Sequence, residues 1–276
     1  MDFEKRTEQP KKWKLHNPST SIVKKKNIII TGASEGIGRE LCKLIANDGH
    51  NLYMLARNSE RLASLKEELS SSTNKIHFIS CDVSDYDQCK AAYDIVKGEF
   101  GSIDIAILNA GIGLNSSLSI PHREVAINTI GINYFGIVNF GHILFPYFRE
   151  KGSGEFIGVS SMADVRGFEG SGIYCSSKSA ASTYLESARA ELRRYGVRVM
   201  TIKPGFVDTN MTKKNKHPMP FIMDATKAAR LIYKAINGKK NSYSFPWQTR
   251  FGSYLLSILP DTVYDKLATL RGDIGQ

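Results

Sequence analysis

Residues 27–38 read NIIITGASEGIG, with three consecutive isoleucines followed by glycines at positions 32, 36 and 38. A short apolar run of this kind is typical of a strand buried on both faces of a parallel sheet. The glycines permit a tight turn, and the amphipathic residues 36–47 that come next predict a helix. A strand, a glycine-rich turn and a helix form the first half of a β-α-β unit, so this stretch decides the fold class.

The same alternation of apolar runs and amphipathic stretches continues to residue 246. Expected strands occupy residues 27–30, 51–55, 76–80, 105–108, 156–160, 197–202 and 242–245. Expected helices occupy residues 36–47, 59–69, 85–100, 122–149, 174–195 and 224–237. Ser59 and Asp85 are expected to cap two of these helices. The pattern predicts an α/β fold: a Rossmann-type, doubly wound, mostly parallel sheet of about seven strands with helices on both faces.

Charge and pattern divide the chain into a basic extension at residues 1–26, an α/β domain at 27–246 and a helical tail at 247–276. The net charge is +10, and the extension holds eight Lys/Arg against three Asp/Glu, which is +5. A solvated tail is the favoured interpretation of the extension, with contacts to anionic lipid, an acidic partner or RNA as alternatives. The extension lacks the interleaved aromatic residues of RNA-binding modules, so no nucleic-acid partner is expected.

The remaining composition favours a cytoplasmic protein. The N-terminus lacks the apolar core of a signal peptide, and no apolar run reaches the roughly 20 residues of a membrane-spanning helix. The four cysteines form no C-x-x-C pair and accompany no histidine cluster, which argues against a metal site. We therefore expect reduced, mostly buried thiols, a cytoplasmic location and no transmembrane segment.

The glycine-rich turn predicts a dinucleotide cofactor, because backbone N–H groups can approach a pyrophosphate at the helix N-terminus. Arg57 and Asn58 lie at the end of the second expected strand, where no acidic residue is present to bind a ribose 2′-hydroxyl. Arg57 has the fixed charge and forked geometry that bind a 2′-phosphate, so NADP(H) is favoured over NAD(H). Glu35 in the turn opposes that choice, and an arginine that merely begins a solvated turn is the alternative interpretation.

Tyr174 and Lys178 are four residues apart on an expected helix, so both side chains lie on one face. Reduction of a carbonyl requires a proton donor at the oxygen, and the pKa of a free tyrosine, near about 10, is too high for ready exchange. A neighbouring ammonium group is expected to lower that pKa. Ser161 ends the fifth expected strand, thirteen residues before Tyr174, where its hydroxyl can hydrogen-bond the substrate oxygen.

Together these motifs resemble the short-chain dehydrogenase/reductase family, which opens with T-G-x-x-x-G-x-G and carries a serine thirteen residues before Y-x-x-x-K. The resemblance implies that Ser161 polarises the carbonyl, that Tyr174 is the acid/base and that Lys178 also binds the nicotinamide ribose. It adds Asn133 as a fourth catalytic residue, with Asn128 as a nearby competitor. The implied cofactor contacts are Gly32, Ser34, Glu35, Gly36, Ile37, Gly38, Arg57, Asn58, Asp82, Val83, Asn109, Ala110, Gly111, Tyr174, Lys178, Pro204, Gly205, Val207 and Thr209.

By the same resemblance, residues 210–223 form a lid over the substrate. The lid combines apolar with basic side chains: Met211, Met219, Phe221, Ile222 and Met223 with Lys213, Lys214, Lys216 and His217. Motif position adds Ile112, Leu114, Met162 and Phe168 to the same cleft. An apolar pocket with a basic rim predicts a lipophilic carbonyl compound, with 3-oxoacyl and long-chain 3-keto substrates as candidates. Residues 52–57 are also similar to 3-ketosphinganine-reductase-like members.

The expected function is NADPH-dependent reduction of a ketone or aldehyde, or oxidation of the matching alcohol. A non-catalytic NADP(H)-binding sensor or scaffold is the alternative, and the retained Ser161, Tyr174 and Lys178 argue against it. Because the family commonly forms dimers and tetramers through its long helices, we expect a homodimer or homotetramer. In the tail, residues 247–259 carry an apolar stripe at helical spacing. This stripe predicts packing on the domain, a cover for the substrate cleft or a dimer contact rather than a membrane contact.

Overall fold

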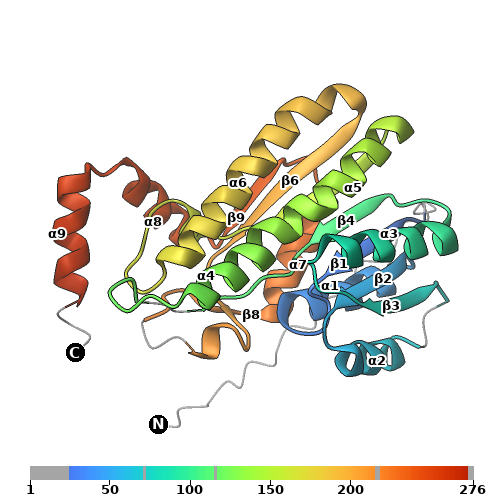
Figure 1. Ribbon diagram of the computed structural model, residues 1–276, viewed down its shortest axis with the longest axis horizontal. Coiled ribbons are helices and arrows are strands. Elements are labelled where there is room, and N and C mark those ends of the chain that lie inside the picture. Colours follow the sequence, from blue (N-terminus) through green and yellow to red (C-terminus); the bar gives the residue numbers. More distant parts are fainter. Residues whose placement is uncertain (1–24, 71–72, 115–116, 215–217, 273–276) are drawn as a thin grey trace, which may run out of the picture.

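A seven-stranded parallel sheet runs through the described part of the chain, in the strand order β3-β2-β1-β4-β5-β6-β9 (Figure 1). The computed structural model describes residues 25–70, 73–114, 117–214 and 218–272. The strands are β1 (Asn27–Thr31), β2 (Asn51–Ala56), β3 (Ile76–Ser80), β4 (Ile105–Leu108), β5 (Gly154–Val159), β6 (Val197–Pro204) and β9 (Ser242–Phe245). All neighbouring strands pair in parallel, and the order reverses between β1 and β4. This sheet confirms the predicted doubly wound α/β fold.

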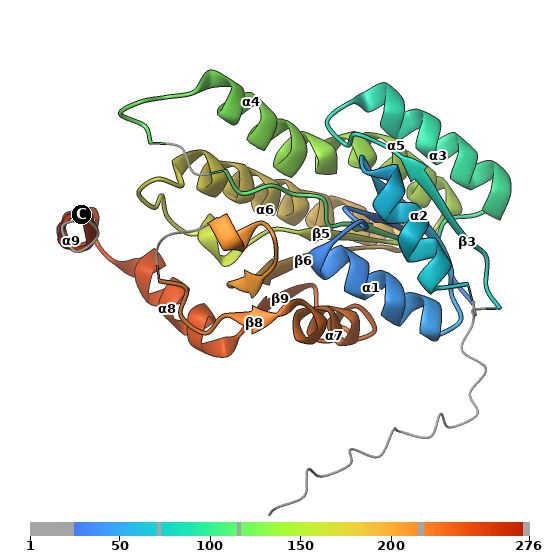
Figure 2. The same cartoon turned by 90° about the horizontal axis from the view of Figure 1, so that it is seen from below.

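Helices cover both faces of the sheet (Figure 2). One face carries α1 (Gly36–Asn47), α2 (Ser59–Glu68) and α7 (Ala225–Ile236). The other face carries α3 (Tyr86–Phe100), α5 (Gly136–Lys151) and α6 (Gly172–Leu192). The remaining helices are α4 (Arg123–Ile130), α8 (Trp247–Ile258) and α9 (Asp261–Gly272). Two apolar layers therefore cover the two faces of the sheet and leave the carboxyl ends of its strands uncovered.

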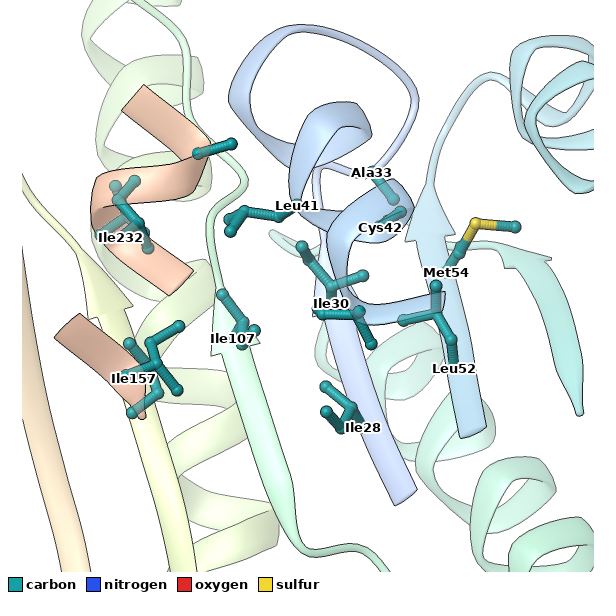
Figure 3. Packing of buried hydrophobic residues seen from close by; sticks show 14 of the residues in the cluster. Ile28, Ile30, Ala33, Leu41, Cys42, Leu52, Met54, Ile107, Ile157 and Ile232 are labelled. Carbon is teal, nitrogen blue, oxygen red and sulfur yellow. The ribbon is translucent and has the colours of Figure 1, made fainter. Parts of the chain in front are cut away.

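The three isoleucines of β1 explain why this strand shows no polar alternation. Ile28 and Ile30 share one core with Leu41 and Cys42 of α1 (Figure 3). Ile29 belongs to the core on the opposite face of the sheet. Because both faces are covered, all three side chains are buried on folding. Each burial stabilises the folded state by roughly 1.5–3 kcal/mol.

The two predicted helix caps have different outcomes. Ser59 is the first residue of α2 and not its cap; Asn58 precedes the helix, and its side-chain oxygen accepts a hydrogen bond from the Arg61 amide at 2.8 Å. Asp85 caps α3 as predicted and accepts a hydrogen bond from a main-chain amide at 3.1 Å. The correction at α2 is a shift of one residue, since Asn and Ser cap helices about equally well.

Of the basic extension, Lys25 and Lys26 are described, and Lys26 pairs with Glu155 at 2.7 Å. The cysteines at positions 42, 81, 89 and 175 are free and buried, as predicted. No described helix is long and apolar enough to cross a lipid bilayer. The division of the chain at residues 26 and 246 stays a prediction.

Candidate active site

The candidate active site lies at the carboxyl ends of the central strands. β1 ends at Thr31 beside the glycine-rich turn, β5 is closely followed by Ser161, and β6 ends at Pro204. The reversal of strand order between β1 and β4 is the point where doubly wound sheets open a crevice for ligands. Motifs that are far apart in the sequence therefore meet at one edge of the sheet.

The glycine-rich turn has no room for side chains at two of its glycines. A Cβ added to Gly32 would lie 2.8 Å from Ala110 Cα, and one added to Gly38 would lie 2.1 Å from the Gly32 carbonyl oxygen. Gly32 and Gly36 also adopt positive φ angles, of 66° and 56°. Helix α1 begins at Gly36, and no side chain caps its first turn. Exposed backbone donors at a helix N-terminus fit the pyrophosphate of a dinucleotide.

Asn109 and Ala110 hold the glycine-rich turn against β4. Both of their backbone amides donate to the Thr31 hydroxyl oxygen at 3.1 Å. The side-chain amide of Asn109 donates to the carbonyl oxygens of Thr31 and Gly32, each at 3.2 Å. Asn109 and Ala110, which are predicted cofactor contacts, thus also hold the glycine-rich turn in position next to β4.

The predicted pair Asp82 and Val83 lies directly after β3. One carboxylate oxygen of Asp82 accepts a hydrogen bond from the Ser84 hydroxyl at 2.7 Å. The Val83 side chain is buried against Gly136, where an added Cβ would lie 2.7 Å from a valine methyl carbon. Val83 therefore leaves only its backbone for a ligand.

Arg57 lies at the end of β2 with its side chain 63% exposed, and its guanidinium is 3.8 Å from the Asp82 carboxylate. Glu35, the acidic residue that opposes a 2′-phosphate, is paired with Arg61. Glu35 also accepts a hydrogen bond from the Asn210 amide at 2.8 Å. The negative charge of Glu35 is therefore offset within the protein, while Arg57 keeps an open guanidinium face. The side-chain oxygen of Asn58, by contrast, is used to cap α2.

Ser161, Tyr174 and Lys178 come together as the motif spacing predicts. Tyr174 and Lys178 share one face of α6, with the Lys178 Nζ 5.9 Å from the centre of the Tyr174 ring. The Ser161 side chain acts on the Tyr174 phenol in the direction that lowers its pKa. The Lys178 ammonium is buried and donates to the Val159 carbonyl oxygen at 3.1 Å.

Burial dominates the electrostatics of this group. Burial lowers the pKa of Lys178 to about 8, and the nearby Asp164 carboxylate opposes that change. Burial also raises the pKa of Tyr174 above its ordinary value, with the Ser161 side chain acting in the opposite direction. Burial thus sets the direction of the pKa shift of Tyr174 in this structure, and the expected lowering of that pKa by Lys178 stays a prediction.

Asn133 lies in a π-helical segment, Gly131–Phe135, that separates α4 from α5 where the sequence predicts one helix. Its buried side chain accepts from the Ile112 amide at 2.8 Å and donates to the Ile112 carbonyl at 2.9 Å. It also donates to the Ser177 hydroxyl at 3.0 Å. A Cβ added to Gly111 would lie 3.2 Å from the Asn133 amide oxygen and 3.3 Å from the Lys178 Nζ, so both groups border this glycine.

Asn128, the competitor of Asn133, is exposed on α4 and does not reach this group. Asn133 lies between the loop after β4 and the helix that carries Tyr174, and its assignment as a catalytic residue stays a prediction.

The motifs do not reveal a buried polar chain behind the catalytic group. Asp164 lies three residues after Ser161, and its nearly fully buried carboxylate pairs with Lys203 at 2.6 Å. Ser182 Oγ lies 2.5 Å from the same carboxylate and 2.8 Å from Ser160 Oγ. The Ser160 hydroxyl donates to the backbone carbonyl of Lys178 at 2.9 Å. A buried carboxylate needs hydrogen-bonding or charged partners. In the sequence, only the closeness of Asp164 to Ser161 could have indicated this role.

The lid segment is built on a small second sheet that pairs β7 (Val207–Asp208) with β8 (Met223–Asp224). The side chains of Val207 and Met223 are buried in the core beside α7, so neither side chain lines the cleft. The expectation that the Met223 side chain faces the substrate is therefore wrong. Val207 can contact a cofactor only through its backbone. Lys216 and His217 lie outside the described residues.

Met211 lies beside Gly113 and the Tyr174 ring, whereas Met162 is buried next to Gly205. A Cβ added to Gly113 would be 3.1 Å from Met211 and 3.9 Å from the Tyr174 ring. A Cβ added to Gly205 would be 2.9 Å from the terminal methyl of Met162. Thr209 borders Gly36, where an added Cβ would lie 3.1 Å from its methyl group. The segment after β6 therefore reaches across to the glycine-rich turn.

Comparison with known proteins agrees with this arrangement. Residues 26–220 match the family model for short chain dehydrogenase. The chain belongs to the short-chain dehydrogenase/reductase family. It is accordingly an oxidoreductase that acts on a small molecule with a nicotinamide cofactor.

Among curated relatives of this short-chain dehydrogenase, an uncharacterized oxidoreductase of Myxococcus xanthus is 32% identical over 240 residues, covering 87% of this chain and 95% of that protein. A 3-ketodihydrosphingosine reductase of Bacteroides thetaiotaomicron is 29% identical over 185 residues, covering 67% of this chain and 65% of that protein. Among solved structures, an alcohol dehydrogenase of Thermococcus sibiricus complexed with 5-hydroxy-NADP has a TM-score of 0.72 at 25% identity, covering 80% of this chain and 95% of that one.

Proposed function

We propose that this short-chain dehydrogenase reduces a ketone or aldehyde with NADPH, or oxidises the matching alcohol, with Tyr174 as general acid/base. The observation that carries the proposal is the grouping of Ser161, Tyr174 and Lys178 at the carboxyl end of β5. The glycine-rich turn lies at the same edge of the sheet, so a cofactor and a substrate can meet there.

In the proposed mechanism each side chain has one task. When bound, NADPH supplies the hydride for the carbonyl carbon. Ser161 donates a hydrogen bond to the carbonyl oxygen as negative charge builds there. Tyr174 gives its phenolic proton to that oxygen, and in the reverse direction it accepts the proton of the alcohol. Lys178 keeps a positive charge beside the phenol and hydrogen-bonds the cofactor ribose, while Asn133 positions the helix turn that carries Tyr174 and Lys178.

The cofactor would be held along the edge of the sheet. Backbone groups from Gly32 to Gly38 would bind the pyrophosphate, because the turn has space for no side chain at its closest points. Asp82 and Asn109 would border the adenosine half, and the segment from Pro204 to Thr209 would border the nicotinamide. Arg57 supports NADP(H) over NAD(H), since its exposed guanidinium can pair with a 2′-phosphate.

A lipophilic substrate is the proposed class. Met211, next to Gly113 and the Tyr174 ring, supports this class, because it offers flexible apolar surface. The resemblance to a 3-ketodihydrosphingosine reductase supports a long-chain 3-keto compound within this class.

A cytoplasmic homodimer or homotetramer is also proposed. A groove between α5 and α6, lined by aromatic residues such as Phe145, Tyr184 and Tyr195 and by the charged Arg149 and Glu191, supports association of two copies. Light scattering of the purified protein tests this directly, and a monomeric mass at micromolar concentration would contradict it.

The test of the proposed function is a substrate panel followed through NADPH absorbance. Short aliphatic, aromatic, 3-oxoacyl and long-chain 3-keto compounds are offered with NADPH and then with NADH. We expect turnover with NADPH, strongest for the long-chain 3-keto compounds. NADPH binding without turnover of any carbonyl or alcohol in the panel would favour the sensor interpretation.

A further inference from the structure

Helix α8 has its apolar side toward solvent and its polar side toward the protein. Trp247, Phe251, Tyr254, Leu255 and Ile258 recur at helical spacing on one face, and all are exposed, from 44% for Leu255 to 73% for Trp247. The opposite face holds half-buried residues that are mostly polar or small, such as Gln248, Thr249 and Ser253, together with Leu256. Buried side-chain oxygens of Gln248 and Thr249 have no hydrogen-bond partner within the described chain. This orientation is the reverse of that of an ordinary surface helix.

The reversed orientation is held by polar contacts. The Arg166 guanidinium donates to the Leu256 carbonyl at 3.1 Å and to the Leu259 carbonyl, and it pairs with Asp261 at 2.7 Å. The same guanidinium lies 5.1 Å from the centre of the Tyr264 ring, and the Tyr264 hydroxyl donates to a loop carbonyl at 2.6 Å. Arg166 therefore joins the end of α8 to the start of α9. The stripe is thus a surface of a helix that is fixed in place.

The helix pair extends from the end of the molecule opposite to α3, as both views show (Figures 1 and 2). Helix α9 adds the exposed residues Val263 and Leu267 to the apolar surface. We call these seven residues of α8 and α9 the tail face. Exposed apolar side chains gathered on a helix face mark a contact with a partner or a membrane.

We propose that the tail face docks the protein on the surface of an anionic lipid bilayer. Its composition fits the membrane interface, where tryptophan and tyrosine lie at the headgroups and Phe, Leu and Ile enter the acyl boundary. The net charge of +10 complements an anionic surface. Because no described helix can cross a bilayer, the contact is peripheral.

The docking surface lies next to the proposed active site but does not depend on its substrate. An added Cβ at Gly205 would lie 3.3 Å from the Thr249 methyl group, so α8 begins beside the segment that borders the cofactor.

The test is sedimentation of the full-length protein with vesicles of phosphatidylcholine alone or mixed with phosphatidylglycerol. We expect binding to the mixed vesicles that weakens with salt, and little binding to phosphatidylcholine alone. The variant Phe251→Ser/Leu255→Ser/Ile258→Ser should lose at least tenfold in affinity. The control variant Tyr86→Ser/Ile95→Ser removes exposed apolar side chains from α3 and should bind like the unmodified protein.

A second measurement reports on α8 itself. The chain contains two tryptophans, so Trp13→Phe leaves Trp247 as the only one. Its fluorescence should shift to the blue on mixed vesicles. The proposal is overturned if Trp247 shows no shift, or if the triple variant keeps its fold and binds vesicles as before. It is also overturned if light scattering shows that the triple variant separates copies of the chain while vesicle binding persists, since the tail face would then be a subunit contact.

Discussion

Lys178 shows how burial prepares a residue for pH-dependent function. Its pKa is lowered to about 8, so the side chain is charged at neutral pH and loses its charge as the pH rises through that value. We predict that kcat/KM for NADPH-dependent reduction is level below about pH 7 and falls about tenfold for each pH unit above about 8. Initial rates across the pH range test this.

The control for this profile is Lys178→Arg, because an arginine stays charged at every pH of the assay. If the variant retains measurable activity, its fall above about pH 8 should disappear. A fall of equal size in the variant would assign the titration to another group.

Asp164 is the positioning residue that the motifs do not reveal. Its buried carboxylate raises the pKa of Lys178 and pairs with Lys203. Asp164→Asn removes the charge at nearly constant size, so we predict that the alkaline limb of the pH profile moves below about pH 8. A merely structural role would lower kcat or stability and leave the position of that limb unchanged.

Arg57 is expected to decide the cofactor. Arg57→Ala should raise the KM for NADPH by roughly 10- to 100-fold, the value of one charge-assisted contact, and leave the KM for NADH unchanged. Steady-state kinetics with both cofactors give the comparison within one variant. Equal increases for both would mean that Arg57 supports the fold of the turn and does not select the 2′-phosphate.

At the scale of elements, the start of α1 is packed closely against the glycine-rich turn. Gly38→Ala would place a methyl group 2.1 Å from the Gly32 carbonyl oxygen, so the helix has to move away from the turn. We predict at least a tenfold loss in NADPH affinity, measured by calorimetry, from a shift of the backbone donors.

Gly98→Ala is the matched control, because Gly98 lies inside α3 with no atom within 4 Å of an added Cβ. The substitution should raise the free energy of unfolding by about 0.5–1 kcal/mol and leave NADPH affinity unchanged. Equal effects of the two substitutions on affinity would contradict the steric explanation for Gly38.

Helices and strands were predictable from the sequence where a local pattern of apolar residues determines them. The apolar runs gave the seven strands of the sheet, because burial on both faces leaves a local pattern. The π-helical segment at Gly131–Phe135 was not predicted, since it depends on contacts of Asn133 with the distant Ile112 and Ser177. Gly131, which begins the segment, and Gly136, which follows it, were the available signal. An added Cβ at Gly136 would lie 2.7 Å from Val83.

At the scale of the whole molecule, motif order predicted the family and the edge of the sheet where the motifs meet. It did not predict the Asp164–Lys203 pair or the outward apolar side of α8, because both arise from long-range packing. Periodicity identifies an apolar stripe but not the direction in which it points, so a sequence cannot separate a core helix from a docking helix.

The central claim is that Tyr174 transfers the proton at the substrate oxygen, and Tyr174→Phe tests it most directly. The measurement compares kcat for carbonyl reduction with the dissociation constant for NADPH in the same preparation. We predict a loss in kcat of about 10²- to 10⁴-fold with NADPH affinity unchanged within about twofold. A variant that binds NADPH normally and retains near-normal kcat would contradict the account, because another group would then have to supply the proton.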